Sequence, residues 1–109
     1  MKWLIEFFND KVEQETLSFQ PKILAKLLHI LELIEEIGPK LGEPYTKPLA
    51  DGIFEIRSKA REGIGRSLFC YQKGNKIIIL HSFIKKSRKT PKKEIEIALS
   101  RKKEVDNES

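Results

Sequence analysis

The sequence predicts an α+β domain in which two helices near the N-terminus pack on a small, mostly antiparallel sheet and a third helix ends the chain. Apolar residues recur at helical spacing in the first half of the chain. Three runs of β-forming residues follow one another in the second half. The length of 109 residues suits one domain. We therefore expect the order β-α-α-β-β-β-α over residues 1–109, with a frayed tail from about residue 104.

The first two elements are predicted from composition and capping signals. "KWLIEFF", Lys2–Phe8, is rich in aromatic and branched residues and is expected to form a strand. Asp10 and Glu13 fit a capping box, so a helix is expected to begin at Asp10. That helix should pause before Pro21, because proline disfavours helical geometry in the residue that precedes it and suits the first turn of a new helix.

The second helix is predicted over Pro21–Ile37, where one face is apolar and the opposite face is charged. We interpret the apolar face as core packing; a face that binds a partner is the alternative. His29 is expected at the surface of this helix. Gly38–Pro39 should end it, and the segment Gly38–Gly52, with three glycines and three prolines, is expected to be an ordered loop.

Three strands and a helix complete the prediction. Ile53–Lys59 alternates apolar and polar residues, Ile64–Gln72 follows a short turn, and Lys76–Ile84 is nearly all apolar, as in a central strand buried on both faces. Thr90 is a good helix N-cap and Pro91 a good first helical residue, so the last helix should begin there.

Composition excludes several classes of protein. No apolar run approaches the ~20 residues of a membrane helix. The N-terminal apolar stretch in "MKWLIEFFND" is too short, and becomes acidic too soon, for a signal peptide. We therefore expect a cytoplasmic protein with no membrane contact. Cys70 is the single cysteine, which suits a reducing compartment, and the two histidines have no metal-ligand spacing. We expect neither a metal nor a cofactor.

The positive charge is confined to the second half of the chain. Residues 1–52 carry nine acidic and six basic side chains, whereas residues 53–109 carry fifteen basic and seven acidic ones. Such asymmetry favours a polyanionic partner on one part of the surface, most plausibly nucleic acid. An ordinary basic surface that keeps the protein soluble is the alternative.

Three motifs carry a family resemblance that spans Lys2 to about Lys103. They are "LADG" leading into the strand "FEIR", "RSLFCY", which opens a strand with arginine, and "LHSFIKKSRKTP", in which the last strand runs into a lysine-rich turn. The chain resembles the RelE/ParE superfamily of bacterial toxins, and most closely the HigB-like, phage-derived branch of type II toxin–antitoxin toxins. The resemblance implies a RelE-like fold of the order given above.

The resemblance also implies an activity. RelE- and HigB-like members are endoribonucleases that cleave mRNA on the translating ribosome, and a cognate HigA-like antitoxin with a helix-turn-helix part neutralises them. Operator DNA would then be bound only through the antitoxin. ParE-like members share the fold but inhibit DNA gyrase, so this target is the alternative. A plain RNA-binding module ranks lower, because no exposed aromatic pair suited to base stacking is evident.

Metal-free RNA cleavage needs a proton acceptor for the 2′-hydroxyl, cations for the phosphorane and an acid for the leaving oxygen. Arg66 matches the superfamily's arginine on the middle strand, and Lys85 and Lys86 match its basic turn. Crowding by Lys86 and Arg88 should lower the pKa of Lys85 and let it titrate. Arg57, on the polar face of its strand, is the fourth catalytic candidate.

Other candidates have weaker support. Arg57 has an alternative role in a surface ion pair with Glu55 or Glu62. Four residues are expected to hold RNA backbone: Arg61, Arg88, Lys89 and Lys92. Three others have a possible role beside an expected structural one: His81, aligned with Ile77 and Ile79 in its strand, Tyr71 and Phe83. Some HigB relatives use His and Asp near the C-terminus; no histidine follows Lys93 here, so the chain would be a Lys/Arg-dependent version.

Overall fold

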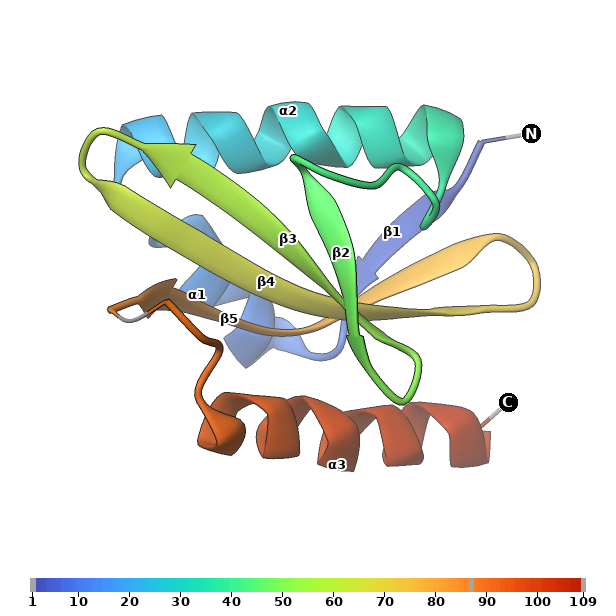
Figure 1. The fold of residues 1–109 in the computed structure, drawn as a ribbon. Coiled ribbons are helices and arrows are strands. Elements are labelled where there is room, and N and C mark those ends of the chain that lie inside the picture. Colours follow the sequence, from blue (N-terminus) through green and yellow to red (C-terminus); the bar gives the residue numbers. More distant parts are fainter. Residues whose placement is uncertain (1, 87, 109) are drawn as a thin grey trace.

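The computed structural model describes residues 2–86 and 88–108 and has an α+β fold in three layers (Figure 1). A five-stranded sheet of order β1-β5-β4-β3-β2 separates α1 and α2 on one face from α3 on the other. The elements are β1 (Leu4–Phe7), α1 (Asp10–Leu17), α2 (Pro21–Ile37), β2 (Thr46–Ala50), β3 (Ile53–Ala60), β4 (Gly63–Gln72), β5 (Lys76–Lys85) and α3 (Lys92–Glu108). The α+β class is confirmed, and the sheet is mostly antiparallel, since three of the four strand pairs among the described residues are antiparallel and β1 pairs in parallel with β5.

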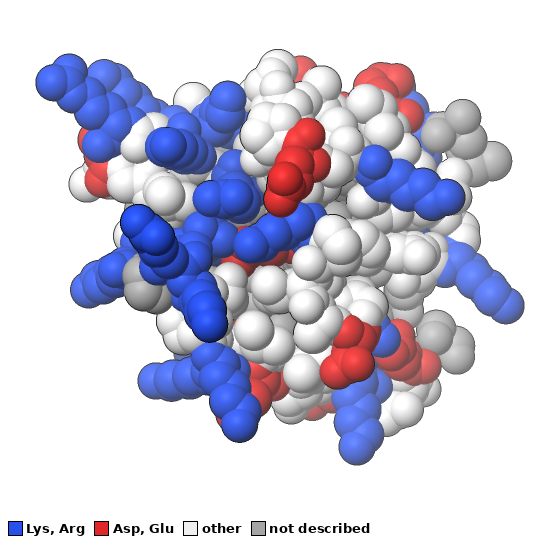
Figure 2. Space-filling model, viewed as in Figure 1, with Lys and Arg blue, Asp and Glu red and all other residues white. Residues whose placement is uncertain are grey.

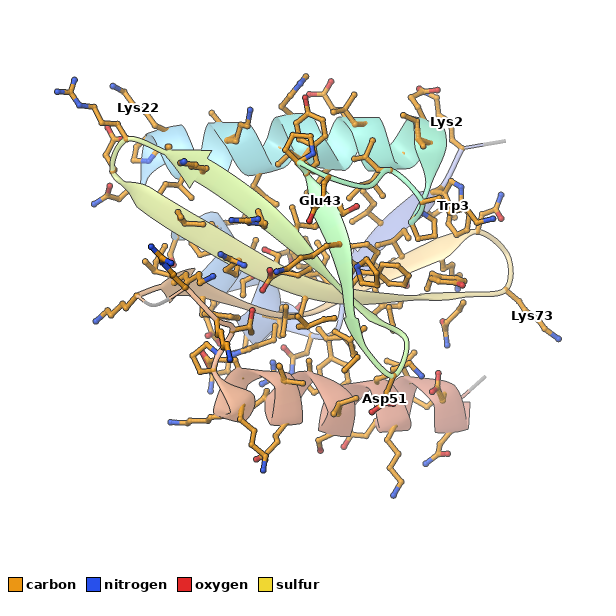
Figure 3. All side chains as sticks on the ribbon, viewed as in Figure 1. Lys2, Trp3, Lys22, Glu43, Asp51 and Lys73 are labelled. Atoms are coloured by element: carbon orange, nitrogen blue, oxygen red, sulfur yellow. The ribbon has the colours of Figure 1, made fainter. Side chains whose placement is uncertain are left out.

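The helices α1 and α2 begin close to the predicted positions. The N-cap of α1 is Asn9, whose side-chain oxygen accepts from the Val12 amide at 2.9 Å, so the capping box predicted from Asp10 is wrong by one residue. Asparagine is among the preferred N-caps for this reason. Pro21 opens α2 as predicted. Lys2 and Lys22 lie near opposite ends of α2 (Figure 3). Lys2 pairs there with Glu36 at 3.1 Å and Lys22 with Glu62 at 3.5 Å.

The predicted loop Gly38–Gly52 contains a strand that the sequence analysis missed. β2 pairs antiparallel with β3 and forms the edge of the sheet, with an irregular register between Pro48 and Ala50. Proline lacks the amide that an inner strand must donate, but an edge strand tolerates it. The prolines that favoured a loop are therefore compatible with β2.

β5 lies between β4 and β1 and contains one extra residue. Leu68 pairs with His81 and Phe69 pairs with Ile79, so Leu80 is unmatched. A bulge of this kind reverses the alternation of side chains that follow it. His81 consequently faces α3 and hydrogen-bonds Glu94, so the predicted alignment of His81 with Ile77 and Ile79 is wrong.

Two apolar cores hold the layers together, one on each face of the sheet. The first, under α1 and α2, comprises Val12, Phe19, Ile23, Leu27, Ile30, Ile34, Ile56, Phe69, Ile77 and Ile79. The second, under α3, comprises Ile53, Leu68, Cys70, Ile78, Leu80, Ala98 and Val105. The apolar face of α2 is therefore core, as interpreted from the sequence, and His29 is exposed.

The C-terminal helix differs from the prediction at both ends. It begins at Lys92, and the Thr90 hydroxyl donates to the carboxylate of Glu55. It continues to Glu108, so the frayed tail predicted from about residue 104 is wrong up to that residue. Val105 is buried, and its carbonyl accepts from Gln72 Nε2 at 3.2 Å, which anchors the last turns to β4. Among the described residues, no helix combines the length and apolarity that a membrane crossing requires.

Candidate functional site

The strand register brings two predicted arginines together. Arg57 of β3 lies directly opposite Arg66 of β4. Residues paired across antiparallel strands project from the same face of a sheet. That face is the one covered by α3, because Leu68, two residues after Arg66, belongs to the core under α3.

Lys85 joins the arginines from the end of β5. It pairs with Ile64 on β4, and an open cleft of about 590 Å³ is lined by Arg57, Ile64, Arg66, Lys85, Lys86 and Arg88. Lys and Arg side chains gather on this part of the surface, beside the β3–β4 turn and the end of β5 (Figure 2). All four residues predicted to be catalytic therefore border one concave site, together with Arg88.

Arg66 forms the buried floor of this cleft. Its side chain is 1% exposed, and Nη1 donates to Oε1 of Glu55, which is 0% exposed. The second Glu55 oxygen, Oε2, accepts from the Thr90 hydroxyl. Burial lowers the pKa of Arg66 and the Glu55 charge opposes this effect. Since arginine stays protonated in proteins, Arg66 remains a cation. Its Nε has no partner among the described residues.

Lys85 has a lowered pKa in the cleft. Its pKa lies below the ordinary value of 10.5, first because of partial burial and then because of the Arg66 charge. Glu55 opposes the shift, and Arg57 and Lys47 add to it. The predicted direction for Lys85 is confirmed, but the predicted cause, Lys86 and Arg88, differs from the causes found. The sheet face, rather than the turn, supplies the neighbouring charges.

Lys47 is a site residue that the sequence analysis missed. It pairs with Glu55 on β3 and is half-buried, so it projects from the face that carries Arg57 and Arg66. The signal for this position would have been a strand at Thr46–Ala50, and Pro48 masked that signal. Lys47 extends the cationic face from the cleft to the edge strand of the sheet.

The predicted RNA-binding residues are divided between the cleft and the outer surface. Arg88 lines the cleft. Arg61 is exposed in the β3–β4 turn and Lys89 is exposed beyond Arg88; neither lines the cleft. Lys92 is exposed at the start of α3, where it pairs with Glu96 at 4.0 Å.

His81, Phe83 and Tyr71 do not line the cleft. His81 is 8% exposed, its Nε2 is 3.0 Å from Glu94 Oε1, and its ring stacks on Phe83 with centroids 5.4 Å apart. The His81 ring thus has a hydrogen-bond partner, and the Phe83 ring has a stacking partner. Tyr71 lies at the far end of β4 and packs edge-on against Trp3 with centroids 6.1 Å apart. The contacts of these three side chains match the structural alternative for each.

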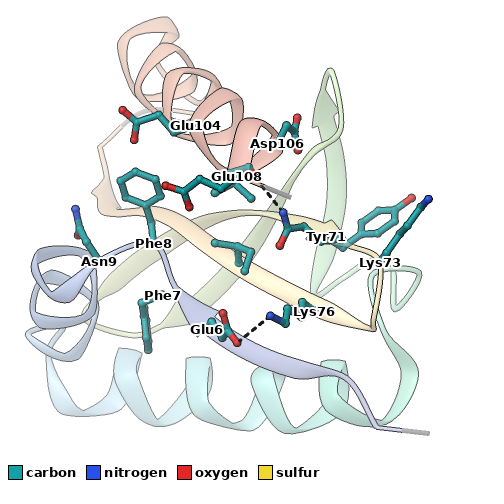
Figure 4. A pocket seen from close by; sticks show the side chains of 13 residues that line it. Glu6, Phe7, Phe8, Asn9, Tyr71, Lys73, Lys76, Glu104, Asp106 and Glu108 are labelled. Atoms are coloured by element: carbon teal, nitrogen blue, oxygen red, sulfur yellow. Dashed lines mark hydrogen bonds and ion pairs between the residues drawn. The ribbon is translucent and has the colours of Figure 1, made fainter.

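A second, larger hollow has the wrong charge for RNA. It has a volume of about 850 Å³ and lies between β1, the β4–β5 hairpin and the end of α3 (Figure 4). Glu6, Glu104, Asp106 and Glu108 line it beside Lys73 and Lys76, and Lys76 pairs with Glu6 at 3.9 Å. The surplus of carboxylates would repel phosphates. Over the described residues, no group of three His, Cys, Asp or Glu side chains is arranged to hold a metal ion.

Comparison with known proteins places the chain in a family. The sequence pattern described as "Phage derived protein Gp49-like (DUF891)" matches residues 14–103. The chain belongs to this Gp49-like family. No curated protein matches the Gp49-like chain in sequence.

Solved structures show the fold of this Gp49-like protein to be that of RelE- and YoeB-type toxins. A doubly substituted mutant of E. coli toxin RelE in the free state superposes with a TM-score of 0.60 at 12% identity, covering 93% of this chain and 98% of RelE. YoeB, from the YoeB–YefM complex of Staphylococcus aureus, gives 0.56 at 17% identity, covering 75% and 95%. The archaeal RelE–RelB complex from Pyrococcus horikoshii gives 0.53 at 16% identity, covering 82% and 100%.

Proposed function

We propose that this Gp49-like protein is the toxin of a type II toxin–antitoxin system and acts as a metal-independent, ribosome-dependent mRNA endoribonuclease that inhibits translation. The observation that carries the proposal is the cleft in which Arg57, Arg66, Lys85, Lys86 and Arg88 meet. Cations from three strands and a turn around one concave site suit a phosphodiester, whose charge increases on the way to the phosphorane.

The residues of the cleft can supply the parts of this reaction. The 2′-oxygen of RNA attacks the adjacent phosphorus as the bond to the 5′-oxygen breaks, leaving a cyclic phosphate and a 5′-hydroxyl. Arg57 and Arg66 would stabilise the phosphorane, since guanidinium groups grip phosphate oxygens at two points. Lys85, with its lowered pKa, is the candidate to move a proton. Lys86 and Arg88 would hold the neighbouring backbone.

An antitoxin partner follows from the same proposal. The structures of similar fold include YoeB bound to YefM in a toxin–antitoxin heterotetramer and an archaeal RelE bound to RelB. We propose a cognate HigA-like antitoxin with a helix-turn-helix part, through which operator DNA would be bound. Co-expression of the protein with the product of a neighbouring open reading frame should abolish its toxicity.

The decisive experiment compares RNA and gyrase as targets. The purified protein is incubated with ribosomes carrying a defined message, and primer extension maps cuts in the message. A supercoiling assay with DNA gyrase runs in parallel. We expect cuts and unchanged supercoiling, and Lys85→Ala should reduce cutting by about 10² or more. Inhibited supercoiling with intact messages would replace the nuclease by a gyrase inhibitor.

A matched substitution controls for net charge. Lys11→Ala removes one positive charge from an exposed site on α1, on the opposite face of the sheet. It should leave cutting unchanged. Equal loss in Lys11→Ala and Lys85→Ala would mean that overall charge matters and that the cleft does not.

A further inference from the structure

Glu55 is a buried carboxylate that joins three parts of the chain at the floor of the cleft. It lies on β3, its Oε1 accepts from Arg66 of β4, and its Oε2 accepts from Thr90, which precedes α3. From the sequence, Glu55 was expected only as a surface partner of Arg57. The structure instead buries it completely, with both oxygens taken by other groups.

We propose that Glu55 and Thr90 form a tether that positions the cationic cleft. Through Arg66, Glu55 holds one cation at the floor. Through Thr90, it fixes the connection between β5 and α3, which carries Lys86 and Arg88 at the rim. This inference rests on the proposed function, because it assigns the tether to the same site, and it makes Glu55 and Thr90 positioning residues.

The place of Thr90 along the chain gives the tether its effect. Thr90 lies two residues after Arg88 and four after Lys86, and two residues before the first residue of α3. A lysine or arginine side chain at an exposed turn loses much conformational freedom when it must meet a phosphate. Anchoring the backbone next to Arg88 reduces that loss, and a cation displaced by as little as about 1 Å can reduce a rate by about 10².

The burial of Glu55 distinguishes it from a group that exchanges protons with a substrate. Its side chain has 0% exposure, and each oxygen accepts a hydrogen bond from a protein donor. A general base must reach the proton that it removes, directly or through a water. Glu55 is enclosed by Arg66 and Thr90, whereas Arg66 keeps an unpartnered Nε within the described residues and lines the cleft. Glu55 therefore acts through Arg66 and Thr90.

Substitutions at Thr90 test the tether with little risk to folding. Thr90→Val keeps the shape and removes the hydroxyl, whereas Thr90→Ser keeps the hydroxyl, and Thr90 is only half-buried. Hydrogen exchange of the Glu94 and Ile95 amides, which donate to the Pro91 carbonyl next to Thr90, reports on the turn without any RNA. We expect exchange about tenfold faster in Thr90→Val, as for the loss of one charge-assisted hydrogen bond, and wild-type exchange in Thr90→Ser.

Cleavage kinetics show whether the tether serves the reaction. Thr90→Val should lower kcat for ribosome-bound mRNA by about tenfold or more, with Thr90→Ser at the wild-type value. Glu55→Gln should also move the pH–rate profile to lower pH, because the Glu55 charge raises the pKa of Lys85. The thermal unfolding midpoint of each variant identifies losses that are due to unfolding.

The outcomes separate the tether from the proposed function. Wild-type exchange and wild-type kcat in Thr90→Val would overturn the tether while cleavage by the wild-type protein stands. Faster exchange with unchanged kcat would also overturn it, since the turn would then be loosened without effect. If the wild-type protein cuts no message, the proposed function fails, and with it the role of the tether, even where exchange confirms the contact.

Discussion

Arg57 and Arg66 occupy opposed positions on β3 and β4, so two guanidinium groups emerge side by side from one face of the sheet. Like charges at directly opposed positions destabilise a sheet. Glu55 neutralises Arg66, but within the described part of the chain Arg57 forms no ion pair. An arrangement that opposes folding and borders a cleft is typical of functional sites, which often keep charged groups that lower the stability of the fold.

Replacing Arg57 should therefore separate stability from activity. Arg57→Gln removes one of the opposed charges and should raise the free energy of unfolding by about 0.5 kcal/mol at low salt. The same change should reduce mRNA cleavage by about 10², because one phosphate-stabilising cation is lost. Urea unfolding in low and high salt measures the first effect, and primer extension the second.

Lys59→Gln is the matched control for this prediction. Lys59 is exposed two residues after Arg57 on the same strand, and its partner on β4 is the uncharged Ile64. It should leave stability within experimental error. If Arg57→Gln destabilised the protein more than Lys59→Gln did, Arg57 would be a structural residue and the repulsion argument would be wrong.

The pH dependence of cleavage should reveal Lys85. Its pKa lies below 10.5, so a limb of the pH–rate profile should fall below that value, rising with pH if Lys85 takes a proton and falling if it gives one. Arg57→Gln should move this limb to higher pH, because the Arg57 charge is one of the causes that lower the pKa of Lys85. The measurement is the single-turnover rate constant of cleavage at a series of pH values.

Lys85→Arg identifies the group responsible for the limb. Arginine keeps the positive charge but does not titrate in this range, so the limb should disappear from the profile. A limb that persists in Lys85→Arg would assign the proton transfer to another residue of the cleft.

The Cys70 thiol should be unreactive in the folded protein. Burial first, and the Asp106 charge second, raise its pKa to about 11, and the side chain is fully buried on β4. Thiolate is the reactive form, so labelling by a disulfide reagent at pH 8 should be slow until urea unfolds the chain.

The unfolded Cys70 thiol, with a pKa near 9.0, releases its proton at lower pH than the folded thiol does, so the free energy of unfolding should fall between pH 9.0 and about 11.

Cys70→Ala separates the contribution of the Cys70 thiol to the pH dependence of stability from that of all other groups. The difference in unfolding free energy between wild type and variant should change with pH only over the interval given above. A difference that stays constant across the interval would show that the folded thiol titrates normally.

Local patterns were sufficient to predict the elements that surround the cleft. The alternation of Phe54, Glu55, Ile56 and Arg57 gave the correct faces of β3, and the apolar run of β5 indicated its central place. Strand register was beyond this reasoning, because the pairing of Arg57 with Arg66 depends on the turn geometry and on packing of the whole sheet. The burial of Glu55 was missed because a carboxylate in an alternating strand ordinarily faces water.

Two errors had local causes. Pro48 masked β2 and hence Lys47, because proline is depleted in strands generally but tolerated at an edge. The bulge at Leu80 has no marker in an unbroken apolar run, so the alternation of β5 was carried one residue too far and placed His81 on the wrong face.

Gly65 lets α2 approach β4 closely, and adding a methyl group there should destabilise the protein. A Cβ at Gly65 would lie 2.8 Å from Ile23 Cγ2 and 2.8 Å from Phe19 Cε2. Both side chains are buried, so neither can move into solvent. Gly65→Ala should therefore lower the free energy of unfolding by about 1–3 kcal/mol, the usual range for overpacking, measured by urea unfolding.

A second substitution tests whether crowding is the cause. Ile23→Val removes one methyl group from α2 and should by itself cost about 0.5–1.5 kcal/mol. In the double variant Gly65→Ala/Ile23→Val the new methyl group gains part of the space that the valine leaves, so the combined loss should be smaller than the sum of the two single losses. Strict additivity in this cycle would mean that the Gly65→Ala penalty comes from the backbone of β4 and that contact between α2 and the sheet is not its source.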